Sequence, residues 1–259
     1  MSQMNTAEVG RHVLVVNPTG ASSVVLACEH ASPFIPPAFA ALGLSEEDQQ
    51  SHAAWDPGAL AVAAHLSRLL DAVLVASGVS RLVYDCNRPP DSPSAMPEVS
   101  EVIQVPGNVD LTEEDRARRV RDYYLPFHAD LQEVVEQTSH PILVTIHSFT
   151  PVYRGLKRDV EVGVLHDADA RLADAMLDTA QKHLSFDVQR NAPYDASDGV
   201  THTLQKHAIE QGHLNVMLEI RNDLIATPEQ QETVATTIAA WLVEACANLK
   251  VTGVELCQV

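Results

Sequence analysis

Two histidines and one glutamate in this sequence stand at the ends of apolar runs. His30 follows VVLAC with one residue between, His147 follows PILVTI, and Glu219 follows VML. A lone histidine in such a position more often hydrogen-bonds a loop carbonyl than binds a metal. Two imidazoles and a carboxylate together, however, form a typical zinc site with an open position for water. These residues therefore predict a metal site, although their spacing is not the H-E-x-x-H of a metal-binding helix.

Amide hydrolysis at such a site also needs a carboxylate as general base, because the attacking water must lose a proton and the leaving amine must gain one. The carboxylates near the histidines are Glu29, Asp56 and Glu219. Two of them have a structural alternative. Asp56 can cap the helix expected to begin at Pro57, and Glu219 can form an ion pair with Arg221.

Arginines beside strand ends suggest a site for an anion. Asn87-Arg88 follows the apolar run around residue 82, with Arg81 seven residues before Arg88, and Arg221 follows Glu219 by two residues. A guanidinium beside an amide can bind a carboxylate through two parallel hydrogen bonds. Most arginines form surface ion pairs, but a few at strand ends of an acidic protein would attract an anionic substrate locally. We therefore expect Asn87, Arg88 and Arg221 to bind substrate.

The composition excludes several classes of protein. The 259 residues include 17 Lys and Arg against 35 Asp and Glu, a formal charge of −18. Such a chain lacks the cationic face that nucleic acids or anionic membranes require. No apolar run approaches the roughly 20 residues of a membrane span, and the first eleven residues lack an apolar signal core. Four scattered cysteines without a C-x-x-C pair favour a reducing, cytoplasmic setting.

Strand and helix patterns alternate along the whole chain. This alternation predicts a single α/β domain over residues 1–259, a three-layer sandwich with helices on both faces of a mixed, mostly parallel sheet. A proline-rich stretch, 89–108, is expected to be a long functional loop or lid. Strands are expected at 23–28, 72–76, 80–84, 141–146, 160–165 and 213–220, and helices from Ser45, from Asp56, from Thr112 to about 137, and at 168–183, 200–211 and 227–249.

The polar residues fall where such a fold binds ligands. Ligands of open α/β sheets gather at the carboxyl ends of the strands. His30, His147, Glu219 and the segment 85–88 all follow predicted strands. The topology should therefore bring them to one edge of the sheet.

These residues belong to blocks that resemble the N-formylglutamate amidohydrolase family. The resemblance covers about residues 20–250, and the blocks occur in the family's order. It implies a fold related to the zinc exopeptidases, that is, the zinc carboxypeptidases and aspartoacylases. The blocks are CEHAS (28–32), AWDPGA (54–59), SRLVYDCNRP (80–89), PEVSEVIQVPGN (97–108), TIHSFTP (145–151) and LEIRND (218–223).

The resemblance implies a role for each candidate residue. His30 and His147 match the two histidines that bind one Zn²⁺ ion per chain. Glu219 matches the late general base, and Asn87-Arg88 match the pair that holds a substrate carboxylate. Arg81 matches an arginine shortly before that pair, and we expect it to be catalytic.

One ligand departs from the carboxypeptidase pattern. That pattern has a glutamate three residues after the first histidine, where this chain has Pro33. Asp56 is the expected replacement, with Glu29 as the alternative. Glu29 is adjacent to His30, so on an extended backbone their side chains would point to opposite faces. This argument favours Asp56 unless a turn redirects Glu29.

The sequence therefore predicts a cytoplasmic, zinc-dependent amidohydrolase. Its substrate would be a small anionic N-acyl amino acid, with N-formylglutamate as the family's example. Two alternatives remain: a carboxypeptidase-like peptidase, and a non-catalytic metal- or anion-binding protein of the same fold. A small closed pocket would favour acyl amino acids, and an open cleft would favour peptides.

Overall fold

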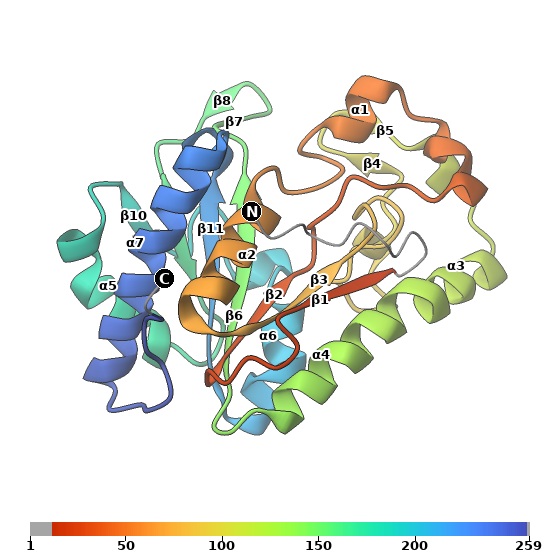
Figure 1. Cartoon of the computed structure of the whole chain (residues 1–259). Helices are drawn as coiled ribbons and strands as arrows, with labels where there is room; N and C mark the ends of the chain where they lie inside the picture. Colours follow the sequence, from red (N-terminus) through yellow and green to blue (C-terminus); the bar gives the residue numbers. More distant parts are fainter. Residues whose placement is uncertain (1–11, 258–259) are drawn as a thin grey trace.

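The computed structural model describes residues 12–257, which form a seven-stranded mixed sheet with helices on both faces (Figure 1). The strands β3, β2, β6 and β11 are parallel, whereas β1 and β9 run antiparallel to their neighbours β3 and β11. In spatial order the strands are β1 (Val13–Val16), β3 (Val73–Ser77), β2 (Val24–Cys28), β6 (Ile142–Phe149), β11 (Leu214–Arg221), β9 (Val162–Leu165) and β10 (Val188–Arg190).

Two helical layers cover the sheet, as the alternating pattern predicts. Alternate residues of each buried strand point to opposite faces, so Val144 packs into one core and Leu143 into the other. The first core includes α2 (Ala59–Leu70), α5 (Arg171–His183) and α7 (Pro228–Asn248). The second includes α4 (Leu125–Gln137) and α6 (His202–His207). The three-layer α/β architecture is confirmed.

Several helix starts follow their predicted caps. Ser45 and Thr112 accept hydrogen bonds from the backbone N–H groups three residues later, at the start of α1 (Glu46–Gln50) and α3 (Glu113–Arg119). Thr227 caps α7 and forms a capping box with Gln230. A π-helical segment, Val120–Tyr124, joins α3 to α4, so the long helix expected from Thr112 is continuous to Gln137.

Shorter elements lie along the carboxyl edge of the sheet. Two small hairpins, β4 (Val99–Ser100) with β5 (Ile103–Gln104) and β7 (Val152–Tyr153) with β8 (Leu156–Lys157), lie at the top of Figure 1. The short 3₁₀ helices span Pro37–Gly43, Pro93–Ala95, Pro106–Asn108, Ala196–Asp198, Ile209–Gln211 and Asn222–Ile225.

No helix within residues 12–257 is both long and apolar enough to cross a membrane.

The predicted strand at 80–84 is wrong. This segment forms turns, in which the N–H of Val83 donates to the carbonyl of Ser80. Leu82, Val83 and Tyr84 are nevertheless fully buried against the α4 side of the sheet. The apolar run therefore reflects burial without strand pairing. As a consequence, the segment 85–88 lies on a loop beyond β3.

Two further expectations need correction. The helix α2 begins at Ala59 after a Gly58 cap, so Asp56 is not its N-cap. Gly58 has φ = 85°, and a Cβ there would lie 2.6 Å from the Ile225 carbonyl oxygen, so this turn requires glycine. The stretch 89–108 is not structureless either, because it contains 3₁₀ turns and the β4–β5 hairpin, and Met96 and Val105 are buried in the core.

Candidate metal centre and substrate cavity

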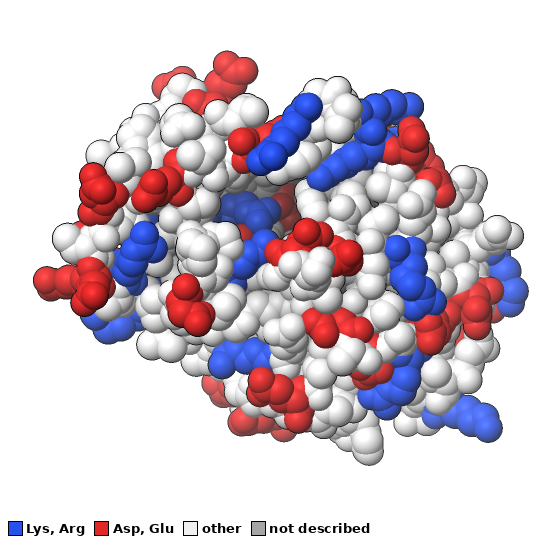
Figure 2. Space-filling model, turned by 180° about the vertical axis from the view of Figure 1, so that it is seen from behind, with Lys and Arg blue, Asp and Glu red and all other residues white. Residues whose placement is uncertain are grey.

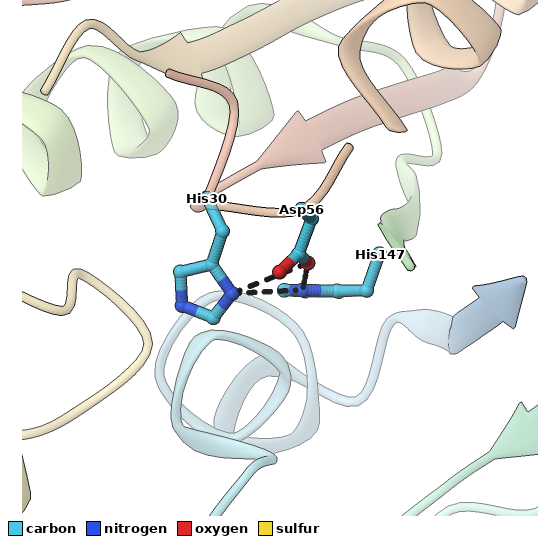
Figure 3. A group of neighbouring side chains, drawn as sticks. All are labelled: His30, Asp56 and His147. Atoms are coloured by element: carbon cyan, nitrogen blue, oxygen red, sulfur yellow. Dashed lines mark hydrogen bonds and ion pairs between the residues drawn. The ribbon is translucent and has the colours of Figure 1, made fainter. Parts of the chain in front are cut away.

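His30, Asp56 and His147 meet at the carboxyl edge of the sheet (Figure 3). His30 follows β2, His147 lies within β6, and Asp56 lies in the turn before α2. The parallel pairing of β2 with β6 brings the two histidines together, although they are 117 residues apart in sequence. All three side chains are buried.

The ligand atoms of this cluster have the spacing of a metal site. Nδ1 of His147 lies 3.2 Å from Nδ1 of His30 and 2.9 Å from Oδ2 of Asp56. The same Asp56 oxygen lies 3.3 Å from Nδ1 of His30. Ligands about 2.0–2.1 Å from a tetrahedral zinc lie about 3.3 Å from one another. The three residues therefore fit a divalent ion, with Asp56 and not Glu29 completing the group.

Carboxylates face the outer nitrogens of both imidazoles. Nε2 of His30 lies 2.7 Å from Oδ1 of Asp85, and Nε2 of His147 lies 3.1 Å from Oε2 of Glu29. A carboxylate at one ring nitrogen favours the N–H there and leaves the lone pair of the other nitrogen for a metal. Both Nδ1 atoms lie inside the cluster. The sequence reasoning missed Asp85, although its place two residues before Asn87 in a polar segment was a signal.

Opposing effects set the pKa values of these groups. Burial raises the pKa of Asp56 and of Asp85, but His30 and other neighbours outweigh burial and hold both well below their usual range. Burial also raises the pKa of Glu29, but His147, the Thr203 hydroxyl and His30 together outweigh burial and lower it. Burial lowers the pKa of His147, but Glu29 and Asp56 raise it well above its ordinary value. For Glu219 burial prevails over the neighbouring histidine and raises the pKa to about 7.

The site holds more negative than positive charge. Four carboxylates, each 5% exposed or less, gather around the histidines: Glu29, Asp56, Asp85 and Glu219. Among the lysines and arginines of residues 12–257, only Arg81 forms ion pairs with them, at 2.8 Å to Asp85 and 3.5 Å to Asp56. His147, whose raised pKa favours its positive form, adds a second cationic group, but the carboxylates still outnumber the positive groups. Buried charges without compensation are costly, so the site is suited to hold a cation.

A cavity of about 280 Å³ opens over the cluster, and Figure 2 shows its opening as a hollow with basic side chains inside. Glu219, which pairs with His147 in the β11–β6 register, lines the cavity. One of its oxygens, Oε2, is buried and has no hydrogen-bond partner among the described residues. An aromatic wall of Phe149, Tyr153 and Tyr194 forms another part of the lining.

Arg88 lines the cavity without an acidic partner. Its Nε donates to the Ser94 hydroxyl at 3.1 Å and its Nη1 to the Asn87 carbonyl at 2.9 Å. Its charge helps to lower the pKa of the nearby Asp85, but among residues 12–257 it forms no ion pair. The guanidinium can therefore bind an anion. Asn87 also lines the cavity, but its side-chain amide donates to the Val200 carbonyl and accepts from the Thr203 N–H, which ties it to the start of α6.

Two arginines are placed differently from expectation. Arg81 lines the cavity, but its guanidinium is held by Asp85 and Asp56. Arg221 does not line the cavity, because it is drawn into ion pairs with Asp223 at 2.8 Å and Glu161 at 3.2 Å. The structure thus separates Arg221 from the expected substrate-binding group. It also leaves Glu219 without the Arg221 partner that the structural alternative required.

Comparisons with known proteins agree with this geometry. The family model described as N-formylglutamate amidohydrolase matches residues 22–226. The crystal structure of gene product Atu2144 from Agrobacterium tumefaciens is 51% identical, with a TM-score of 0.91 over 93% of this chain and 97% of that one. N-formylglutamate amidohydrolase from Ralstonia eutropha JMP134 shares the fold at 19% identity and a TM-score of 0.54, over 92% and 97% of the chains. A search of curated proteins gives no match. The matched region covers most of the chain, which therefore belongs to the N-formylglutamate amidohydrolase family.

Proposed function

We propose that this protein is a metal-dependent hydrolase that cleaves the amide bond of a small N-acyl amino acid, such as N-formylglutamate. The observation that carries the proposal is the surplus of buried carboxylates around His30, Asp56 and His147. Such a surplus is costly in a fold that binds no cation, but a hydrolytic metal centre uses it to hold its ion. Membership of an amidohydrolase family supports the same chemistry.

In this proposal His30, Asp56 and His147 hold one divalent ion, and histidine nitrogens with one carboxylate suit zinc. The ion would supply Lewis-acid polarisation of the amide and a water of lowered pKa. Glu219 faces the cavity beside the cluster, where its carboxylate can take a proton from the attacking water and deliver it to the leaving nitrogen. Arg81 holds Asp56 and Asp85 in place and so positions the cluster.

The cavity supports a small anionic substrate. Its volume of about 280 Å³ lies at the lower limit of ligand pockets, which suits an acyl amino acid better than a peptide. Arg88 offers an unpaired guanidinium to a substrate carboxylate. These features favour the amidohydrolase over the peptidase alternative.

A metal analysis combined with a release assay tests the proposal. Protein purified without chelator should contain about one zinc per chain and should release the acyl group from members of an N-formyl and N-acetyl amino-acid panel. Dialysis against a chelator should stop release, and added Zn²⁺ should restore it. Cleavage of peptides but of no acyl amino acid would favour the peptidase. A protein that binds metal but cleaves neither class would favour the binding-protein alternative.

We expect Arg88→Ala to impair substrate binding. Removing one partner of a desolvated charge pair costs roughly 2–5 kcal/mol, which is a loss in kcat/KM of about 30-fold or more. The loss should be mainly in KM if Arg88 binds ground and transition states alike. Arg88→Lys should also be impaired, because an ammonium group cannot reproduce the planar fork. Steady-state kinetics on paired carboxylate and carboxamide substrates measure the effect.

Arg221→Ala is the matched control, because Arg221 ends β11 but lies outside the cavity. Its KM should stay close to that of the wild type. If Arg88→Ala loses no preference for the carboxylate substrate, Arg88 does not bind that group.

A further inference from the structure

Glu29 is a fully buried carboxylate that neither binds the metal directly nor takes a proton in the proposed reaction. It follows β2 directly, and its side chain has 0% exposure. Neither Oε1 nor Oε2 has a well-aligned hydrogen-bond donor within residues 12–257, although the Thr203 hydroxyl helps to lower the pKa of Glu29. An ionised group in such a place is costly unless an opposite charge compensates it. Its ion-pair partner is the imidazole of His147.

The His147 ring stands between Glu29 and the metal cluster. Its Nδ1 lies 2.9 Å from Asp56 Oδ2 and 3.2 Å from His30 Nδ1, inside the cluster. Its Nε2, on the other edge of the ring, lies 3.1 Å from Glu29 Oε2. Nε2 is also buried, and among the described residues the ion pair with Glu29 is its one polar contact. Glu29 and the outer edge of His147 therefore depend on each other.

A comparison with Asp85 shows that Glu29 depends more on His147 than Asp85 depends on His30. Asp85 occupies the corresponding place behind His30, but it also accepts from the Arg81 guanidinium at 2.8 Å and from the Asn87 N–H at 2.9 Å. Loss of His30 would leave Asp85 with two partners. Glu29 has no arginine and no backbone N–H as a partner among the described residues, and besides the histidines only the Thr203 hydroxyl lowers its pKa. Its charge therefore serves mainly the histidine and, through the histidine, the cation.

We propose that Glu29 is a positioning residue for the metal. It holds His147 as the tautomer that carries hydrogen on Nε2, which keeps the Nδ1 lone pair directed at the ion. Its negative charge also strengthens the imidazole as a ligand. This inference rests on the proposed function, because it requires that His30, Asp56 and His147 bind a metal.

The proposal predicts that loss of Glu29 weakens metal binding without destabilising the fold. Outer partners of ligating histidines typically contribute 10–100-fold in metal affinity. Glu29→Gln keeps an oxygen acceptor but loses the charge, so zinc should bind about tenfold more weakly. Glu29→Leu loses both, so the loss should be about 100-fold. The melting temperature of the metal-free protein should stay the same or rise, because His147 keeps Asp56 as a charged partner at 2.9 Å and each variant removes one negative charge from a cluster of like charges.

Thr145→Val is the matched control. Thr145 lies on β6 two residues before His147, is fully buried, and its hydroxyl has no hydrogen-bond partner among the described residues. Removing this hydroxyl changes a buried polar atom in the same strand without touching a carboxylate. Zinc affinity should therefore match that of the wild type.

The experiment is competition between each protein and a chromophoric chelator for Zn²⁺, with thermal unfolding of the metal-free proteins alongside. The role of Glu29 is supported if zinc affinity decreases from the wild type to Glu29→Gln and again to Glu29→Leu, while the metal-free melting temperatures are unchanged or raised. Equal zinc affinity of the wild type and both variants overturns it and leaves the proposed function intact. Weaker binding with a lowered metal-free melting temperature also overturns it, since Glu29 would then support the fold. A wild type that binds no zinc overturns the proposed function itself.

Discussion

Replacing Glu219 by Gln should lower kcat by roughly 10²–10⁴, the usual contribution of general acid–base catalysis. The amide has nearly the shape of the carboxyl group but cannot accept a proton from water. Because Glu219 is not needed in the ligand set of His30, Asp56 and His147, the variant should keep its fold and its metal. Kinetics on protein of verified metal content measure the loss. Near-normal turnover of a metal-replete Glu219→Gln protein would show that Glu219 is not the base.

The pH profile gives a second test of the same residue. Burial raises the pKa of Glu219 to about 7, so the carboxyl group becomes protonated as the pH falls through that value. A protonated Glu219 cannot act as a base, and kcat/KM of the wild type should therefore fall with decreasing pH. A nearby dication would lower the pKa, so we expect the inflection at or below about 7. The residual activity of Glu219→Gln should lack this inflection.

The second large effect concerns the metal itself. His147→Ala should abolish metal retention, because it removes one of three protein ligands and leaves the Glu29 charge without its partner. Metal content after purification without chelator measures the loss, and circular dichroism verifies the fold. His128→Gln is the control, since His128 is buried but lies outside the cluster. Full metal occupancy in folded His147→Ala protein would contradict the ligand assignment.

The sequence predicts best those elements whose signal is local. The runs before His147 and Glu219 are strands because both faces of β6 and β11 are buried, and Thr112 and Thr227 cap helices with their own hydroxyls. The run at 80–84 looks the same but forms turns, because an apolar pattern reports burial and does not report a hydrogen-bonded neighbour. Local patterns are insufficient to predict a contact between residues that are distant in sequence.

In the candidate site, too, some features follow from the local sequence and others depend on contacts between distant residues. The cluster contains Asp56 and not Glu29, as expected, but not through alternation along a strand, because Glu29 and His30 both lie in a turn after β2. The pattern could not show that Glu29 would reach His147, because that contact depends on how β2 and β6 pair. Arg221 lies two residues after Glu219, so alternation along the strand suggests that it also faces the cavity. Its ion pair with Glu161, 60 residues away in sequence, holds it outside the cavity instead.

The long spacing of the three cluster residues has a consequence for the lifetime of the folded protein. His147 is 117 residues from His30 and 91 from Asp56, and the three lie on β6, after β2 and before α2. An ion bound to all of them closes large loops of chain, as a disulfide bond does. It is therefore a reversible cross-link between the two strands at the centre of the sheet. When metal is scarce, the protein would lose kinetic stability together with activity, and its removal by proteolysis would follow metal supply.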